Sequence, residues 1–445
     1  MIEAEAVTED IWAEVDKSVE SCSLTHCGFC TFECPMYKEF GFESYTSRGK
    51  KLLIKNLRKG RDEDILNLSE FSPNDLEKEF FACTLCGYCD FICAPSSDSQ
   101  AAVRNTQIFE EIRALLVENG IFPEEDVELC KGIKNHFNPW KGARRTDKKN
   151  VAKELIGLGM KDAEKDSVNS ILYVGCTTAS FAKSTDFPLG NIVKSAAKIL
   201  SSVDQDVGVL GKEEMCCGGI LKRTGFVTAH NPHWSSFEEC MTKNLDLFER
   251  LEIQEIITAC PGCAKTFAED YKDEMEDLGI KTVHLVEKMV ELLDEGTISL
   301  GEFPIPMTVT FHDPCHLVRH LARFRQLEGN EYGVEKVVEG PRKVLKAIPN
   351  IEFMEVPIYH GFRSHCCGSG AGLNNAFHEN ALNVGKRRAA ELEDCLEKGN
   401  HEEKAIVTAC PFCNIMLREA LRQLGSEKNV YDIAEIVGEA LDGAV

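Results

Sequence analysis

The residues with the clearest chemical potential are four closely spaced cysteines in the segment CTLCGYCDFICAP: Cys83, Cys86, Cys89 and Cys93. The first three, at C-x2-C-x2-C spacing, would lie on one tight loop and bind three corners of a cubane iron–sulfur cluster. The fourth begins the next segment and, in ferredoxins with two clusters, binds the other cluster. A zinc ribbon would need two separated C-x2-C pairs. The run therefore predicts a [4Fe–4S] cluster.

An earlier group of cysteines has a related but less regular spacing, C-x4-C-x2-C-x3-C-P. Its members are Cys22, Cys27, Cys30 and Cys34. A C-x4-C-x2-C beginning is also typical of plant-type [2Fe–2S] sites, and that alternative stays open. The x3-C-P ending favours a second [4Fe–4S] cluster. If the ligands cross over between motifs, one cluster takes Cys22, Cys27, Cys30 and Cys93, and the other takes Cys34, Cys83, Cys86 and Cys89.

The second half of the chain contains an internal repeat of cysteines. Cys216, Cys217, Cys260 and Cys263 recur at an offset of 150 as Cys366, Cys367, Cys410 and Cys413. A fifth cysteine precedes each set, and these two, Cys176 and Cys315, are 139 residues apart. Five thiolates are one more than tetrahedral zinc or an ordinary cubane needs. Each set therefore indicates either an atypical cluster or a zinc site with one bystander.

The two halves of the chain predict different elements around these cysteines. In the first part, residues 47–58 and 100–118 have helical periodicity, and Ser72-Pro73 is typical of a helix start. From residue 170 short apolar strands alternate with amphipathic segments, as in α/β units. Each set of five cysteines follows such strands, for example those at 255–259 and 404–409. Because the carboxyl ends of parallel strands share one sheet edge, we expect each set to converge there.

We therefore expect an α-helical, two-cluster ferredoxin-like domain followed by two tandem α/β cysteine-rich domains, at residues 1–165, 166–300 and 301–445. The boundaries are placed in the polar stretch 162–169 and around 296–306. Residues 1–20 are acidic and polar, unlike a signal or transit peptide. They are typical of an amphipathic helix capped by Thr8, with Ile11, Val15 and Val19 on one face.

Composition narrows the class of protein further. The net charge of −23 argues against a nucleic-acid partner, which would need a basic surface. No apolar run reaches the roughly 18 residues of a membrane span. The 21 cysteines are odd in number and mostly at metal-ligand spacing, so a reducing compartment is expected. We expect a cytoplasmic protein, or one held peripherally at a membrane through a partner subunit.

The pattern C…CCG…C-x-x-C resembles the cysteine-rich CCG domains of the heterodisulfide reductase family. From about residue 15 the chain is similar to the fused iron–sulfur and CCG-domain catalytic polypeptide of that family, its D type, which is equivalent to the C and B polypeptides joined in one chain. The resemblance implies one or two noncubane [4Fe–4S] clusters in the CCG domains, with zinc as the alternative at the first site. The implied ligands are Cys176, Cys216, Cys217, Cys260 and Cys263 at the first site, and Cys315, Cys366, Cys367, Cys410 and Cys413 at the second.

The resemblance also implies a reaction: reductive cleavage of a disulfide of the coenzyme M–coenzyme B type, in anaerobic metabolism such as methanogenesis. The enzyme is expected to act within a complex, because no flavin, nicotinamide or haem motif is evident. Its electrons would come from a flavoprotein or a membrane cytochrome b partner. One alternative is an electron-relay component of a flavin-linked 2-hydroxyacid or glycerol-3-phosphate dehydrogenase or a similar membrane-associated complex. Another is that zinc fills both CCG sites and only shapes a binding surface.

Other residues carry weaker signals. His316, next to Cys315, is the candidate proton donor to a leaving thiolate, with a hydrogen bond to cluster sulfur or backbone as the alternative. We expect His312, His320 and His365 to be structural or to support the ligands. The basic segment 131–149 is expected to be a solvated linker face, with steering of an anionic substrate or docking of an acidic partner as the alternative. Three cysteines lie outside every motif, Cys130, Cys240 and Cys395, and the last two are expected to be packed thiols.

Overall fold

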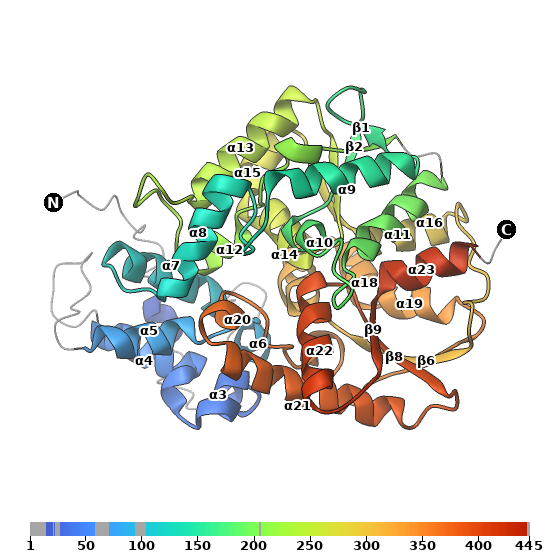
Figure 1. Ribbon diagram of the computed structural model, residues 1–445. Coiled ribbons are helices and arrows are strands. Elements are labelled where there is room, and N and C mark those ends of the chain that lie inside the picture. The colour runs from blue at the N-terminus through green and yellow to red at the C-terminus, as the bar shows by residue number, and fades with distance from the viewer. Residues whose placement is uncertain are drawn as a thin grey trace.

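The computed structural model describes residues 15–20, 22, 27–57, 71–93, 104–203 and 206–442. Its N-terminal part is helical, and most of its helices lie on the left of Figure 1. The elements of this part are α2 (Phe29–Phe32), α3 (Pro35–Phe40), η1 (Glu43–Tyr45), α4 (Ser47–Leu57), α5 (Pro73–Phe81), α6 (Tyr88–Ile92), α7 (Asn105–Glu118), α8 (Glu124–His136) and α9 (Arg145–Gly157).

The helices expected from the sequence are present, with small differences at their ends. The helix predicted at 47–58 is α4, and the one predicted at 100–118 is α7, which begins at Asn105. Pro73 is the first residue of α5, because a proline lacks the N–H that a first helical turn leaves unpaired. Residues 15–20 are helical with Val15 and Val19 buried, whereas Thr8 and Ile11 lie outside the described residues.

The middle of the chain forms a five-stranded parallel sheet with the order β1-β3-β2-β4-β5. Its strands are β1 (Lys161–Asp162), β2 (Ser170–Tyr173), β3 (Val207–Val209), β4 (Glu255–Thr258) and β5 (Lys281–His284). The accompanying helices are α10 (Cys176–Ser180), α11 (Gly190–Ser201), η4 (Gly211–Glu213), α12 (Gly219–Arg223), α13 (Phe237–Arg250), α14 (Pro261–Lys265), η5 (Thr266–Asp270), α15 (Lys272–Asp277) and α16 (Leu285–Asp294).

The last part forms a four-stranded parallel sheet with the order β7-β6-β8-β9. Its strands are β6 (Met307–His312), β7 (Ile351–Met354), β8 (Glu403–Thr408) and β9 (Asn429–Asp432). The accompanying helices are η6 (His316–Leu321), α17 (Ala322–Leu327), α18 (Glu331–Val338), α19 (Gly340–Lys346), η7 (Gly361–Arg363), α20 (Leu373–Ala376), α21 (His378–Leu396), α22 (Pro411–Gln423) and α23 (Ile433–Asp442).

The two sheets repeat one topology. Strands β3-β2-β4-β5 of the first sheet stand in the same order as β7-β6-β8-β9 of the second, so the repeat in the cysteines accompanies a repeat in strand order. The first sheet has an additional edge strand, β1, paired with β3. This strand precedes the boundary predicted at residue 165, so the sheet begins a few residues earlier than expected.

A continuous apolar core joins the two sheets. Helix α11 packs against α23, and buried residues of both helices, such as Ile192 and Val437, belong to the same cluster. A second cluster joins the N-terminal helices to the first sheet, and a third joins the second cysteine run to the second sheet. Because apolar burial is the main favourable term in folding, this continuity holds the three parts in one arrangement.

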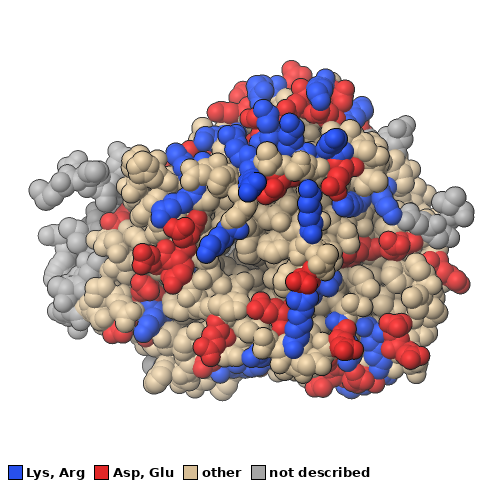
Figure 2. Space-filling view, viewed as in Figure 1, with Lys and Arg blue, Asp and Glu red and all other residues tan. Residues whose placement is uncertain are grey.

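The surface contains a basic region, and the described helices include no membrane span. Figure 2 shows Lys and Arg side chains gathered around α9 and its neighbours, where Lys141, Arg144, Arg145 and Lys149 are exposed. None of the helices in the described part of the chain is long and apolar enough to cross a membrane.

Candidate iron–sulfur sites

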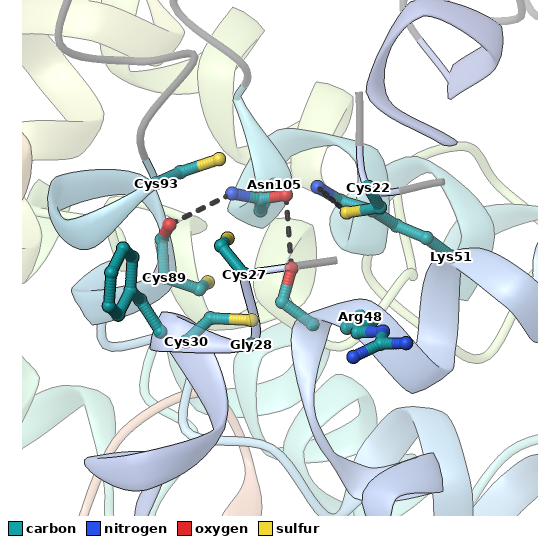
Figure 3. Close-up of a pocket in the computed structure, with 11 residues that line it drawn as sticks. Cys22, Cys27, Gly28, Cys30, Arg48, Lys51, Cys89, Cys93 and Asn105 are labelled. Atoms are coloured by element: carbon teal, nitrogen blue, oxygen red, sulfur yellow. Dashed lines mark hydrogen bonds between the residues drawn. The ribbon is translucent and has the colours of Figure 1, made fainter. Parts of the chain in front are cut away.

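The first cavity with cysteines lies in the N-terminal part, between the two ferredoxin-type motifs. Figure 3 shows side chains from both cysteine motifs entering it. The cysteines that line it are Cys22, Cys27, Cys30, Cys89 and Cys93. The cavity thus contains the four cysteines that crossed ligation assigns to one cluster, because Cys93 of the second motif lies beside the first motif.

A cation lies beside this cavity. The Lys51 Nζ atom is 3.6 Å from the Cys22 Sγ atom, and Lys51 is buried. Burial raises the pKa of Cys30, while Lys51 opposes that effect. Four thiolates in a cavity concentrate negative charge, and a nearby ammonium favours their ionised, metal-binding form.

The second cavity adjoins the first, because Cys30 and Cys89 line both. Its cysteines are Cys30, Cys34, Cys83, Cys86 and Cys89, so it contains the other crossed set. Lys50 is fully buried here and donates to the carbonyl oxygen of Tyr45 at 2.8 Å. Burial raises the pKa of Cys34 to about 12, with Lys50 acting in the opposite direction. The donor sets of both cavities fit iron–sulfur clusters.

Both five-cysteine sets lie at the carboxyl ends of three adjacent parallel strands. In the first sheet Cys176 follows β2, the adjacent pair follows β3 and the C-P-x-C pair follows β4. In the second sheet the same members follow β6, β7 and β8. All ten cysteines are buried. The expectation that each set converges on one sheet edge is confirmed by this placement.

Within each set the thiols interact in a chain. In the second set Cys315 interacts with Cys366, Cys366 with Cys367, and Cys367 with Cys413, whose Sγ atoms are 3.3 Å apart. Hydrogen bonds from Cys366 lower the pKa of both Cys315 and Cys367 well below the usual value. In the first set Cys216 has the same effect on Cys217. Thiols this close together can bind one shared metal centre.

The glycine of each CCG sequence is required by the fold. Gly218 and Gly368 have φ values of 79° and 92°, which side chains rarely adopt. A Cβ atom on Gly368 would lie 2.2 Å from the carbonyl oxygen of Ala381. The chain therefore turns sharply after the adjacent cysteines, which lets both of them face one centre.

Each CCG site also has a buried cation. At the first site Lys148 forms an ion pair with Glu214 at 3.1 Å. Burial alone would lower the pKa of Lys148, but Cys176 and Glu214 raise it. At the second site the negative groups Cys86 and Cys315 likewise raise the pKa of buried Arg319. These cations compensate the charge that ionised thiols would place in a buried site.

The second ferredoxin-type motif directly contacts the second CCG site. Cys86 lies in one buried cluster with Cys366, and its interaction with that thiol lowers the pKa of Cys86 to about 6. Arg319 supports the contact by donating to the carbonyl oxygen of Cys86 at 2.6 Å and to that of Ser364 at 2.6 Å. The two CCG sites also adjoin, because helix α14, which follows Cys260, packs against η6, which follows Cys315.

An aromatic contact bridges the two CCG sites. Trp140 stacks on Phe412, which lies between Cys410 and Cys413, with ring centroids 5.9 Å apart. Its indole N–H donates to the Thr177 hydroxyl at 3.2 Å, next to Cys176. The loop that carries Trp140 therefore contacts ligand loops of both sites.

The histidines have different surroundings. The His316 Nδ1 atom lies 3.6 Å from the Cys315 Sγ atom, and its ring stacks on that of His320. The Nε2 atom of His320 is 2.9 Å from the carbonyl oxygen of Leu85. Both ring nitrogens of His365 contact carboxylates, those of Glu391 and Glu33. His320 and His365 thus connect the second CCG domain to the N-terminal part, as expected for structural residues.

The remaining predictions concern the basic segment and the cysteines outside the motifs. Five of the seven Lys and Arg residues in the basic segment are exposed, but Lys148 is not part of a solvated face, because helix α9 turns it toward Glu214. Cys240 and Cys395 are buried in α13 and α21, and Cys130 is buried in α8. The first two are packed thiols, as expected.

Comparisons with known proteins agree with this geometry. Residues 170–268 and 309–418 match the model of the CCG cysteine-rich domain, and residues 18–96 match that of the 4Fe-4S dicluster domain. The D polypeptide of the dihydromethanophenazine:CoB–CoM heterodisulfide reductase of Methanosarcina barkeri is 27% identical over 443 residues, which cover 98% of this chain and 97% of the relative. These domains and relatives together fit a fused, D-type protein of the heterodisulfide reductase family.

Other relatives of this chain are named for different activities. The B polypeptide of the fumarate reductase (CoM/CoB) of Methanothermobacter marburgensis is 25% identical over 95% of this chain and 73% of its own length. The EtfAB:quinone oxidoreductase of Syntrophomonas wolfei is 27% identical over 76% of this chain and 43% of its own length. A solved glutamate racemase of Bacillus anthracis matches with a TM-score of 0.25 and 11% identity, a likeness too weak to support a functional comparison.

The family assignment supports an iron–sulfur oxidoreductase with an N-terminal ferredoxin-like domain and tandem CCG domains. Sequence reasoning missed several of the residues around its sites. The buried cations Lys50, Lys51, Lys148 and Arg319 have no spacing signature, and neither has the Trp140–Phe412 contact. The only sequence feature that pointed to any of them was the basic segment, which contains Lys148 and Trp140.

Proposed function

We propose that the chain is the catalytic component of a disulfide reductase complex. It receives electrons at the ferredoxin-like clusters and uses them to cleave a disulfide of the coenzyme M–coenzyme B type between the CCG sites. The observation that carries this proposal is the packing of Cys86 in one buried cluster with Cys315, Cys366 and Cys367, which joins the second cluster cavity to the second CCG site. Because helix α14 of the first CCG domain packs against η6 of the second, all four cysteine sites lie in one continuous series.

This series of cysteine sites suits the number of electrons that disulfide reduction requires. One disulfide takes two electrons and two protons and gives two thiols, whereas ferredoxin-type clusters transfer electrons one at a time. Cys30 and Cys89 each line both N-terminal cavities, so the two cavities adjoin. Electrons entering at either cavity therefore have a short path to the second CCG site.

The chain's cysteines would hold the cofactors in four groups. In the proposal the two crossed sets of four hold [4Fe–4S] clusters, and each five-cysteine set holds a noncubane [4Fe–4S] cluster. When bound, these clusters supply electron storage and open iron positions for sulfur. The buried cations beside each set offset the negative charge of the thiolates.

The protein's own residues would position the substrate and supply protons. The loop containing Trp140 joins ligand loops of both CCG sites and would hold them in place around the substrate. His316 is retained as the candidate proton donor at the second site, because its Nδ1 atom is 3.6 Å from Cys315. A histidine suits this role, since its ordinary pKa lies near neutrality.

The electron donor is proposed to be a flavoprotein or a membrane cytochrome b partner. It would dock near the first cavity, where Cys27 is exposed. Relatives that are components of reductases with several polypeptides support a role within a complex.

A second candidate is an electron relay between a flavoprotein and a quinone, without a disulfide substrate. The similarity to an EtfAB:quinone oxidoreductase favours it, although this chain spans less than half of that relative. A relay needs no second multi-thiol site, whereas this chain has complete five-cysteine sets in both CCG domains. We therefore favour the reductase.

The test is an anaerobic assay of the cluster-replete chain with reduced viologen as the donor and coenzyme M–coenzyme B disulfide as the substrate. We expect viologen oxidation that depends on the disulfide and is lost in Cys367→Ala. The matched control is Cys395→Ala, which removes a buried thiol outside the sites. Full iron and sulfide content without turnover of any disulfide would contradict the proposal and favour the relay. About eight irons with one zinc per CCG site would contradict both.

A further inference from the structure

One buried histidine distinguishes the two CCG sites. His312 ends strand β6, three residues before Cys315, and is 1% exposed. Tyr173 holds the equivalent place in the first copy, three residues before Cys176 at the end of β2. The Tyr173 hydroxyl donates to the carbonyl oxygen of Met215. The first site therefore has no imidazole at this position.

An arginine determines which nitrogen of His312 carries the hydrogen. The Nε atom of Arg388 donates to the His312 Nδ1 atom at 3.1 Å. Arg388 is buried and also donates to Tyr359, Ser364 and Glu391, so its orientation is held from several sides. A guanidinium only donates hydrogen bonds, which makes Nδ1 an acceptor. The neutral imidazole then carries its hydrogen on Nε2.

The Nε2 atom of His312 faces the thiols of the second site. It is buried and forms no hydrogen bond with another nitrogen or oxygen of the described residues. A ring nitrogen of His312 and the Sγ atoms of Cys367 and Cys413 all lie within 4.8 Å of one another. Since Nδ1 is engaged by Arg388, Nε2 is the nitrogen available to these sulfurs. Buried donors without a partner are rare, so this one indicates an acceptor at the site.

We propose that the Nε2–H group of His312, positioned by Arg388, donates a hydrogen bond to the sulfur of the second CCG centre at Cys367. This inference rests on the proposed function only in requiring a cluster at that site. Hydrogen bonds to cluster sulfurs favour the reduced form and so raise the reduction potential. The second centre, which adjoins Cys86, is then easier to reduce than the first, where Tyr173 stands. His312 is a positioning and tuning residue, distinct from the candidate proton donor His316.

The test compares variants of the complete, anaerobically reconstituted chain by redox titration followed with electron paramagnetic resonance. In His312→Leu we expect reduction of the second centre to be about tenfold less favourable, a shift of about 59 mV to lower potential for a one-electron couple. His312→Gln, whose amide can donate, is expected to restore part of the shift. Tyr173→Phe is the matched control at the first site and should leave the second centre unchanged.

Iron analysis separates the outcomes. Full iron content with an unchanged potential in His312→Leu would overturn this inference and leave the proposed function standing. Zinc in place of iron at the second site would overturn both. If His312→Leu does not retain the centre, the wild-type chain labelled with 15N-histidine provides the test. Magnetic coupling between a histidine nitrogen and the second centre is expected, and its absence would overturn the inference.

Discussion

Arg113 of helix α7 provides the sharpest test of how the three parts of the chain are held together. It is fully buried and makes six hydrogen bonds to five backbone carbonyl oxygens. The acceptors are Phe80, Phe81 and Cys83 beside the second cluster cavity, Arg223 in the first CCG domain and Ala371 in the second. One side chain thus joins the cluster loop to both CCG domains.

The structure sets the size of the expected effect. Replacing Arg113 with Met leaves five buried carbonyl groups without this donor, and each unsatisfied group costs about 1–3 kcal/mol. Relaxation and entering water will satisfy some of them, so we expect a loss of about 3–5 kcal/mol, as for removal of other buried charged partners. At about 2.1 cal/mol/K of unfolding entropy per residue, that loss corresponds to a decrease in melting temperature of about 3–5 °C for a chain of this length. Arg113→Lys keeps the charge but at most three donors, so its effect should be intermediate.

The assay measures melting temperature by circular dichroism together with iron content under anaerobic conditions. Because Cys83 lies in the loop that Arg113 supports, we expect Arg113→Met to lose iron from the second cavity as well as stability. Arg250→Met, at an exposed site on α13, is the matched control. A melting temperature and iron content equal to those of the control would refute the reasoning.

Two further predictions concern other buried charged groups. Burial raises the pKa of Asp126 to about 7, so the native state binds a proton that the unfolded chain releases near pH 4. Its stability should therefore fall by about 4 kcal/mol as the pH rises from about 4 to 7, and Asp126→Asn should remove that dependence in denaturant unfolding at pH 5 and pH 8. Parallel pH dependence in both proteins would contradict this. Lys148→Met leaves Glu214 buried without its partner, so we expect iron to be lost from the first CCG site alone, with Lys149→Met as the exposed control. Equal iron content in the two variants would show that the cation is dispensable.

Local sequence was sufficient to predict the secondary structure around the sites. The strand before Cys315 and the helix over Ser47–Leu57 follow from apolar periodicity, which a short segment carries by itself. Identical strand order in the two CCG domains agrees with the repeat of the cysteines. The edge strand β1 was missed, because two residues are too few to show a period.

The surroundings of the cysteines could not be predicted in the same way. Lys148 belongs to a basic run typical of a solvated face, yet α9 places it beside Glu214, 66 residues away. His312 was expected to be structural or to support the ligands, but its hydrogen bond from Arg388, which belongs to a different element, α21, could not be predicted. Such partners come from distant parts of the chain, and no local pattern specifies them.

The sequence by itself determined the chemistry of this protein: cysteines at fixed spacing define which thiols can share a loop, and the repeat defines two equivalent frameworks. The tertiary structure decided how those sites relate. Only packing brings Cys93 beside the first motif, Cys86 against Cys366, and a cation or an imidazole to particular thiols. The physical reason is that ligand spacing is a property of short loops, whereas contacts between sites depend on how the apolar faces of separate elements are buried together.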